Sequence, residues 1–173
     1  MKKALGGFTT AAILIFVIIV FLFCTVRIPA GYVGVVYNMN GGISDKTLSQ
    51  GFHVVAPTQN VTTYSIGIEQ SYLTASKDGD SNGDESFEVP SNDGKGLTVD
   101  MTFTYRYDAD RVADTFTRFK GQSGKDVKDS FIKPNIMSWT KEVTAKYSVI
   151  DLLGDKRATL NSELTDYLKQ KFE

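Results

Sequence analysis

Ala11-Ala-Ile-Leu-Ile-Phe-Val-Ile-Ile-Val-Phe-Leu-Phe-Cys24 is the centre of an almost wholly apolar run that extends from Ala4 to Val26 without a charge. Two lysines precede the run, and Arg27 follows it. A helix needs about 20 apolar residues to cross roughly 30 Å of hydrocarbon. The run therefore predicts a single-pass membrane anchor at residues 1–27, and the rest of the chain is expected to work at a membrane surface.

A cleaved secretory signal is the alternative interpretation of this run. Such a signal has an apolar stretch of about 7–15 residues and then a cleavage site with small residues at alternate positions. A cut after Ala30 would put Ile28 where a small residue is needed, and a lipoprotein signal would need a small residue where Phe23 precedes Cys24. The sequence therefore favours a retained anchor.

The charges at the two ends of the run predict its orientation. Lys2, Lys3 and the amino terminus lie on one side, whereas Arg27 stands alone on the other side until Lys46. Positive charge favours the cytoplasmic side. We therefore expect a cytoplasmic N-terminus and a domain on the extracytoplasmic side of the cell membrane.

The composition beyond the anchor excludes several classes of function. From Arg27 onward, 17 Lys and Arg residues stand against 20 Asp and Glu without a basic block, so nucleic acid binding is not indicated. Cys24 is the single cysteine and lies in the run, so the exported part has no disulfide. His53 is the only histidine, which argues against a zinc site and leaves an anchored hydrolase without a visible nucleophile motif.

Strands are predicted first along the chain. Runs rich in β-branched and aromatic residues indicate short strands at 32–37, 51–55 and 61–68. Between Leu97 and Tyr107, apolar and polar residues alternate strictly over 11 positions. Such alternation predicts a strand with one face on a core and the other in solvent.

Helical spacing follows the strands. Helices are predicted from Asp110 to about Phe119, from about Asp126 onward, and from Asp155 to the C-terminus. Ser148-Val-Ile-Asp151 has the form of a capping box, and Pro134 should kink the second helix or mark its true start. Phe131, Ile136 and Trp139 share one helical face, which is more typical of core than of a partner-facing groove. Strands before helices indicate an α+β fold.

Several segments, in this order and spacing, resemble the stomatin/prohibitin/flotillin/HflK-C (SPFH) superfamily, and within it the prohibitin-like bacterial members. They are Val26-Arg-Ile-Pro-Ala-Gly-Tyr-Val-Gly-Val-Val-Tyr37, Leu48-Ser-Gln-Gly-Phe-His-Val-Val-Ala-Pro57, the stretch from Ser91 to Tyr107, Ile132-Lys-Pro134, and Lys141-Glu-Val-Thr-Ala-Lys-Tyr-Ser148. The resemblance covers residues 26–173. It implies a transmembrane helix followed by an SPFH (band 7/PHB) domain with an antiparallel β-sheet and packed helices, β-rich over 28–108 and helical over 109–173.

The resemblance also implies a function. Such proteins are non-enzymatic scaffolds, in which many copies form a ring or cage around a membrane microdomain. The partners implied are membrane lipids, further copies of the chain, and a membrane AAA protease of FtsH type. Family members usually continue into a long coiled coil, whereas this sequence ends inside a predicted helix.

The polar stretch from Ser76 to Pro90 is longer than the family resemblance leads us to expect, and it suggests a different function. Within it, Asp78, Asp80, Asn82 and Asp84 occupy the alternate positions of a calcium loop. The bidentate glutamate expected at the twelfth position is Val89, and a solvated turn would have the same composition. The alternative to a scaffold is therefore an anchored binding module of low oligomeric state, with calcium as its possible cofactor.

Three residues just beyond the run are candidates for contact with the membrane interface. They are Ile28, Tyr32 and Val33. Tyrosine is enriched at that depth. The alternative is that Tyr32 and Val33 are ordinary core residues of the first strand.

Overall fold

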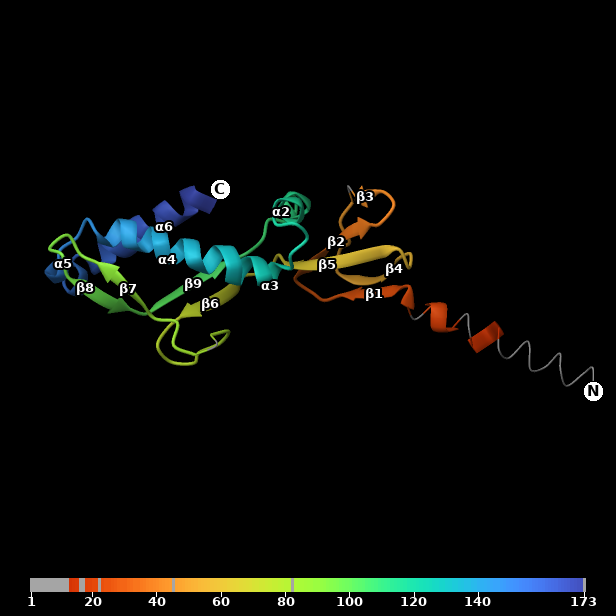
Figure 1. The fold of residues 1–173 in the computed structure, drawn as a ribbon, viewed down its shortest axis with the longest axis horizontal. Helices are drawn as coiled ribbons and strands as arrows, with labels where there is room; N and C mark the ends of the chain where they lie inside the picture. Colours follow the sequence, from red (N-terminus) through yellow and green to blue (C-terminus); the bar gives the residue numbers. More distant parts are fainter. Residues whose placement is uncertain (1–12, 16–17, 22, 45, 82, 173) are drawn as a thin grey trace, which may run out of the picture. The chain divides into compact units, whose positions relative to one another are not determined.

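The backbone hydrogen bonds divide the β-rich part of the chain into small antiparallel sheets. The computed structural model describes residues 13–15, 18–21, 23–44, 46–81 and 83–172. The strands are β1 (Thr25–Ile28), β2 (Tyr32–Asn38), β3 (Gly42–Ile43), β4 (Gly51–Val54), β5 (Gln59–Ser65), β6 (Glu69–Leu73), β7 (Phe87–Pro90), β8 (Gly96–Val99) and β9 (Met101–Tyr105). In the described residues they pair as β1-β4, β3-β2-β5, β6-β9 and β7-β8 (Figure 1).

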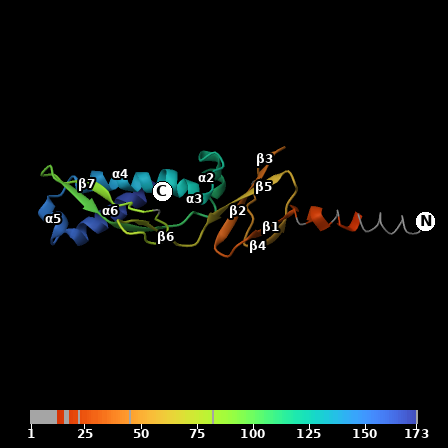
Figure 2. The ribbon, with the colours of Figure 1, turned by 60° about the horizontal axis from the view of Figure 1, so that its bottom comes forward.

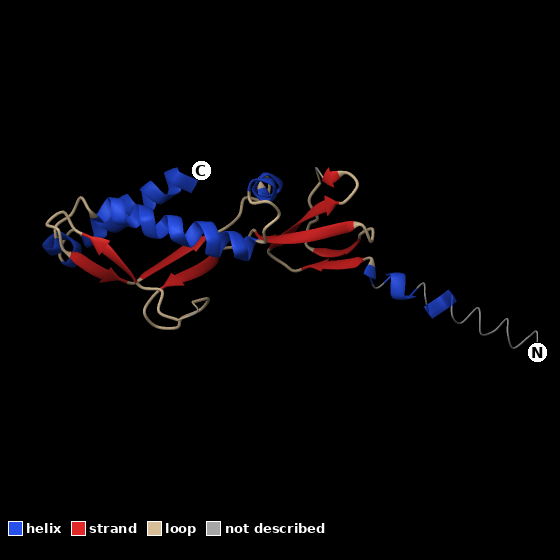
Figure 3. Cartoon of the chain, in the orientation of Figure 1, coloured by secondary structure: helices blue, strands red, loops and turns tan. Residues whose placement is uncertain are grey.

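The helices follow the strands, as the sequence predicts. They are α2 (Val112–Arg118), α3 (Gly124–Val127), the π-helical turn η1 (Lys128–Ile132), α4 (Lys133–Thr144), α5 (Val149–Leu153) and α6 (Arg157–Phe172) (Figure 3). Pro134 lies in the first turn of α4, which continues directly from the π-helical turn η1, so it marks the change from π-helical to α-helical hydrogen bonding and not the start of a separate helix. The capping box is confirmed, because Ser148 Oγ accepts from the Asp151 N–H at 3.2 Å. This order confirms the α+β fold.

The chain folds as two units. Unit 1 comprises Met1–Gly67 and Tyr107–Gly124, and unit 2 comprises Ile68–Arg106 and Lys125–Glu173. Both units contain strands and helices, so the division in space differs from a division along the chain into 28–108 and 109–173.

Unit 1 is built around β2, the central strand of its three-stranded sheet. Val33, Val35 and Val36 are buried, and α2 packs against this strand. Tyr64 and Tyr107 also pack in this core, with their ring centroids 5.2 Å apart in an edge-to-face arrangement. Tyr64 donates to the Gln122 carbonyl at 2.5 Å, and burial raises its pKa to about 12.

Unit 2 packs the α4–α6 layer against short hairpins. The alternation predicted over Leu97–Tyr107 is present, because every apolar residue in it is less exposed than its polar neighbours. The strand itself is interrupted at Asp100, whose carboxylate accepts from the Ala75 N–H at 2.9 Å. One alternating stretch therefore serves two antiparallel strand pairs, β8 with β7 and β9 with β6.

The anchor predicted at residues 1–27 falls largely outside the described residues. Over the part of the chain that the structure describes, no helix combines the length and the apolar character needed to cross a membrane.

Gly34 provides a test of packing in unit 1. A Cβ at this position of β2 would lie 2.8 Å from Val61 Cγ1 and 2.9 Å from Ile28 Cδ1. Because Val61 is β-branched and fixed in β5, we expect Gly34→Ala to lower the free energy of unfolding by about 1–3 kcal/mol. The control is Gly41→Ala, since a Cβ there would meet only Asn38 Nδ2 at 3.7 Å. Equal stabilities in chemical unfolding of the detergent-solubilised chain would contradict this packing.

Candidate functional site

The register of β1 against β4 fixes which part of unit 1 lies beside the end of the apolar run. Thr25 pairs with Val54, and Arg27 pairs with Phe52. Just beyond the strands, the Cys24 carbonyl accepts from the Val55 N–H at 2.6 Å. The loop that follows β4 is therefore level with the last residues of the run.

This end of unit 1 exposes apolar side chains. We call it the apolar end and define it by Phe52, Val54, Ala56, Pro57 and Met39. Phe52 is 64% exposed, Val54 66% and Met39 69%, and the other two are also exposed. Met39 belongs here because its N–H donates to the Thr58 carbonyl at 3.1 Å. Contiguous exposed apolar residues of this kind mark interaction surfaces.

The residues predicted to touch the membrane interface are placed differently. Ile28 is 2% exposed and Val33 is buried, so both side chains pack in the core of unit 1. Tyr32 is half-buried and pairs with Ser65, at the opposite end of β2 from the apolar end. An interface role for these three residues stays a prediction, and core packing is the role observed for Ile28 and Val33. The signal for the apolar end is the apolar character of residues 52–57, which sequence alone does not place beside the run.

The acidic loop of unit 2 is held by two nearly buried lysines. Asp80 accepts from Ser71 Oγ at 2.9 Å and from the Tyr72 N–H at 3.0 Å, and it pairs with Lys128. Lys133 Nζ lies 2.5 Å from Glu85 Oε2 and 3.6 Å from Asp80 Oδ2. The lysine side chains are only 8% and 9% exposed. These contacts tie the loop to η1 and to the start of α4.

The electrostatics of this cluster follow from its partial burial. Burial raises the pKa of Asp80, but hydrogen bonds from Lys128, Ser71 and Tyr72 and the charge of Lys128 outweigh it, and the pKa falls to about 2. Burial likewise lowers the pKa of Lys128, but its bond to Asp80 and the charge of Asp129 raise it overall. Both partners therefore stay charged at neutral pH.

The predicted calcium ligands make separate local contacts. Asp78 accepts from Ser76 Oγ at 2.6 Å, and Asp84 accepts from the Ser86 N–H at 3.0 Å and its hydroxyl at 2.6 Å. Asn82 lies outside the described residues. Among those described, no three His, Cys, Asp or Glu side chains converge as metal ligands would. Calcium binding stays a prediction. The positive charge observed beside Asp80 is the ammonium group of Lys128.

Sequence reasoning missed the two lysines, although a signal for them existed. Lys128 falls within the apolar stripe of Val127, Ile132 and Ile136, and Lys133 lies at its edge. A charged residue at a core-facing position requires a partner of opposite charge. The partner itself cannot be read from the sequence, because each ion pair joins residues 48 positions apart.

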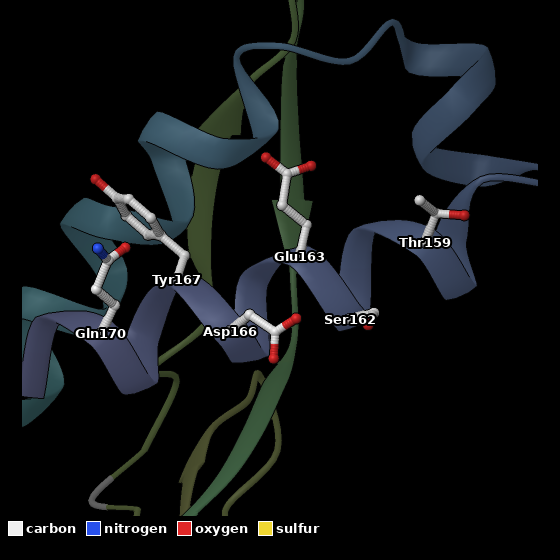
Figure 4. Close-up of a pocket in the computed structure, with 6 residues that line it drawn as sticks. All are labelled: Thr159, Ser162, Glu163, Asp166, Tyr167 and Gln170. Carbon is white, nitrogen blue, oxygen red and sulfur yellow. The ribbon is translucent and has the colours of Figure 1, made fainter. Parts of the chain in front are cut away.

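A shallow groove runs along α6. Thr159, Ser162, Glu163, Asp166, Tyr167 and Gln170 line it (Figure 4). Glu163 accepts from Lys146 at 2.8 Å and from Tyr147 at 2.5 Å, and Tyr167 donates to Glu142 at 2.6 Å. These groups join α4 and the segment that follows it to α6, so their observed role is structural.

Asp80→Asn tests the lysine cluster. The folded pKa of Asp80 lies below its unfolded value, so its stabilising effect is complete above about pH 4 and is lost as the pH falls towards 2. We expect the variant to lose about 2–3 kcal/mol of unfolding free energy at pH 7, and the difference from wild type to close between about pH 4 and 2.

The matched control is Asp84→Asn, which removes another carboxylate of the same loop. Among the described residues Asp84 accepts only from the neighbouring Ser86, and these solvent-exposed hydrogen bonds lower its pKa, so this variant should lose clearly less unfolding free energy at pH 7 than Asp80→Asn does. If chemical unfolding shows the same effect for both variants, the loop is not held by Asp80.

Comparisons with known proteins bear on the whole fold. No curated protein matches the chain significantly. The model of the SPFH domain / Band 7 family matches residues 26–173, which include both units except for the apolar run. Members of this family are generally membrane-associated scaffolds without catalytic activity. The match spans well over half of the sequence, and the chain therefore belongs to the SPFH domain / Band 7 family.

Proposed function

We propose that this protein is a single-pass membrane scaffold of prohibitin-like type, anchored by residues 1–27. The observation that carries the proposal is the register that places the apolar end of unit 1 level with the end of the apolar run. A bilayer entered by the run would receive the apolar end at its interface, since the two are joined by hydrogen bonds. The same strand register would then set the height of unit 1 above the lipid.

The described part of the run supports an anchor through its exposure to solvent. Ile13, Leu14, Ile15, Ile18 and Phe21 are all more than half exposed, and residues 13–15 and 18–21 are helical. Side chains of this kind are costly in water and favourable in hydrocarbon. We keep the predicted orientation, with the N-terminus in the cytoplasm, because two lysines precede the run.

Anchoring has a consequence for assembly. Copies held at one height and in one orientation meet at high effective concentration, so weak lateral contacts suffice to associate them. Identical head-to-tail contacts that close by rotation give a ring. A ring or cage of this kind would enclose a patch of lipid, and a membrane AAA protease of FtsH type is the class of client we propose for it.

The two other functions receive no support from a specific contact. A binding module based on the acidic loop would need free carboxylates, whereas Asp80 and Glu85 pair with lysines. A hydrolase would need a base aligned with a nucleophile, and His53 Nε2 instead lies 2.7 Å from the Ser49 carbonyl oxygen.

The proposal predicts the size of the complex in membranes. We expect the full chain, extracted with its surrounding lipid by a copolymer, to give many-copy assemblies in negative-stain imaging and mass photometry. A chain that begins at Cys24, which keeps β1 and its pairing with β4, is the control and should be monomeric at the same protein concentration, because it loses the common plane that concentrates the copies. Monomers from the full chain in lipid would contradict the scaffold function.

A further inference from the structure

Helix α5 presents two aliphatic side chains to solvent. Ile150 is 83% exposed and Leu153 is 72% exposed, the highest values for large apolar residues in the described part of α5 and α6. Residues three apart on a helix are neighbours on its surface, so the two side chains form one patch. We call it the α5 patch.

The backbone beneath the α5 patch is firmly held. The Ser148–Asp151 capping box fixes the first turn of the helix, and Asp151 also pairs with Lys156 at 2.9 Å. Gly154 ends the helix where a Cβ would lie 2.8 Å from the Ile150 carbonyl oxygen. Five residues alone would not form a stable helix. The local contacts therefore maintain a helix whose apolar residues face outward, which pre-organises the patch for a partner.

A second apolar surface lies on the same unit. Phe131, Trp139 and Phe172 form it, and we call it the aromatic patch. The Phe172 and Trp139 rings meet edge-to-face at 4.9 Å, and the Phe131 and Phe172 rings at 6.5 Å. Phe131 and Phe172 are exposed, and Trp139 is half-buried. Aromatic faces of this kind are enriched at protein interfaces.

The two patches lie at opposite ends of one pair of helices. Contacts that set the register of α4 against α6 are Trp139 with Phe172, Tyr167 Oη with Glu142 at 2.6 Å, and Lys146 Nζ with Glu163 at 2.8 Å. Residues 139, 142 and 146 meet residues 172, 167 and 163 in that order, so the two helices run antiparallel. Figures 1 and 2 both show α5 at the closed end of this pair and the C-terminus towards the other end. With 16 residues, α6 separates them by about 24 Å.

We infer that the α5 patch of one copy packs on the aromatic patch of the next copy. The inference rests on the proposed scaffold function and names the lateral contact. Each copy carries the α5 patch and the aromatic patch at opposite ends of unit 2. A head-to-tail contact that repeats from copy to copy requires two different surfaces of this kind. A contact made by one patch on both copies would instead stop at a dimer.

The size of the two patches favours a second anchored copy as the occupant. Two aliphatic side chains against three rings cover far less than the roughly 800 Å² per partner of a stable complex in solution. Such a contact is effective only when the partners are already concentrated. Copies anchored side by side in one membrane meet that condition.

Site-directed cross-linking in membranes tests the contact without changing any of the five side chains that define the two patches. In full chains with Cys24→Ala, one tagged copy carries Asp155→Cys beside the α5 patch, and a differently tagged copy carries Lys171→Cys beside the aromatic patch. A short bis-maleimide should join unlike copies at least 10-fold more than like copies. Asn161→Cys, exposed in the middle of α6, replaces Asp155→Cys in the control and should give no such product.

A second variant tests the side chains themselves. Ile150→Asp with Leu153→Asp, on the copy that carries Asp155→Cys, should abolish the cross-link, and these exposed positions leave the core untouched. Cross-links between like copies, or none while the wild-type chain stays a many-copy assembly, would overturn this contact and leave the scaffold function standing. A wild-type chain that is monomeric in the same membranes would overturn both.

Discussion

The antiparallel register between β1 and β4 is the constraint from which the functional account follows. It joins the residues that end the apolar run to the loop at Val54–Pro57 through the Cys24–Val55 hydrogen bond. A shift of the register by one residue would move Phe52 and Val54 to the face that carries Ile28 and His53. Because the run and the loop cannot separate without breaking this pairing, whatever receives the run also receives the apolar end.

Unit 2 depends on a different interaction. The polar loop that begins at Ser76 contains Asp78, Asp80, Asp84 and Glu85. A loop with this many charges would ordinarily stay solvated. Asp80 instead pairs with Lys128 in η1, and Glu85 pairs with Lys133 at the start of α4. Gly79 makes the approach possible, since its φ is +53° and a Cβ there would overlap the Tyr72 ring. The helix pair that carries the α5 and aromatic patches is thereby tied to the hairpins below it.

Much of the local structure follows from the sequence, because local interactions determine it. The alternation over Leu97–Tyr107 and the capping box at Ser148 each depend on residues a few positions apart. The functional surfaces depend on distant pairs. Nothing local indicates that Val54 lies opposite Thr25, or that Asp80 pairs with Lys128. Candidates chosen by closeness to the run, such as Ile28 and Val33, therefore pack in the core, while Phe52 and Val54 reach the surface.

The central claim is that the apolar end contacts lipid, and the depth of a fluorophore at Val54 tests it most directly. In the full chain with Cys24→Ala, an environment-sensitive dye on Val54→Cys is compared with the same dye on Ala30→Cys, an exposed position beyond the far end of β1. In bilayers with spin-labelled lipid, the account predicts blue-shifted, strongly quenched emission at Val54 and water-like, weakly quenched emission at Ala30. Equal quenching at the two positions, or water-like emission at Val54, would contradict it.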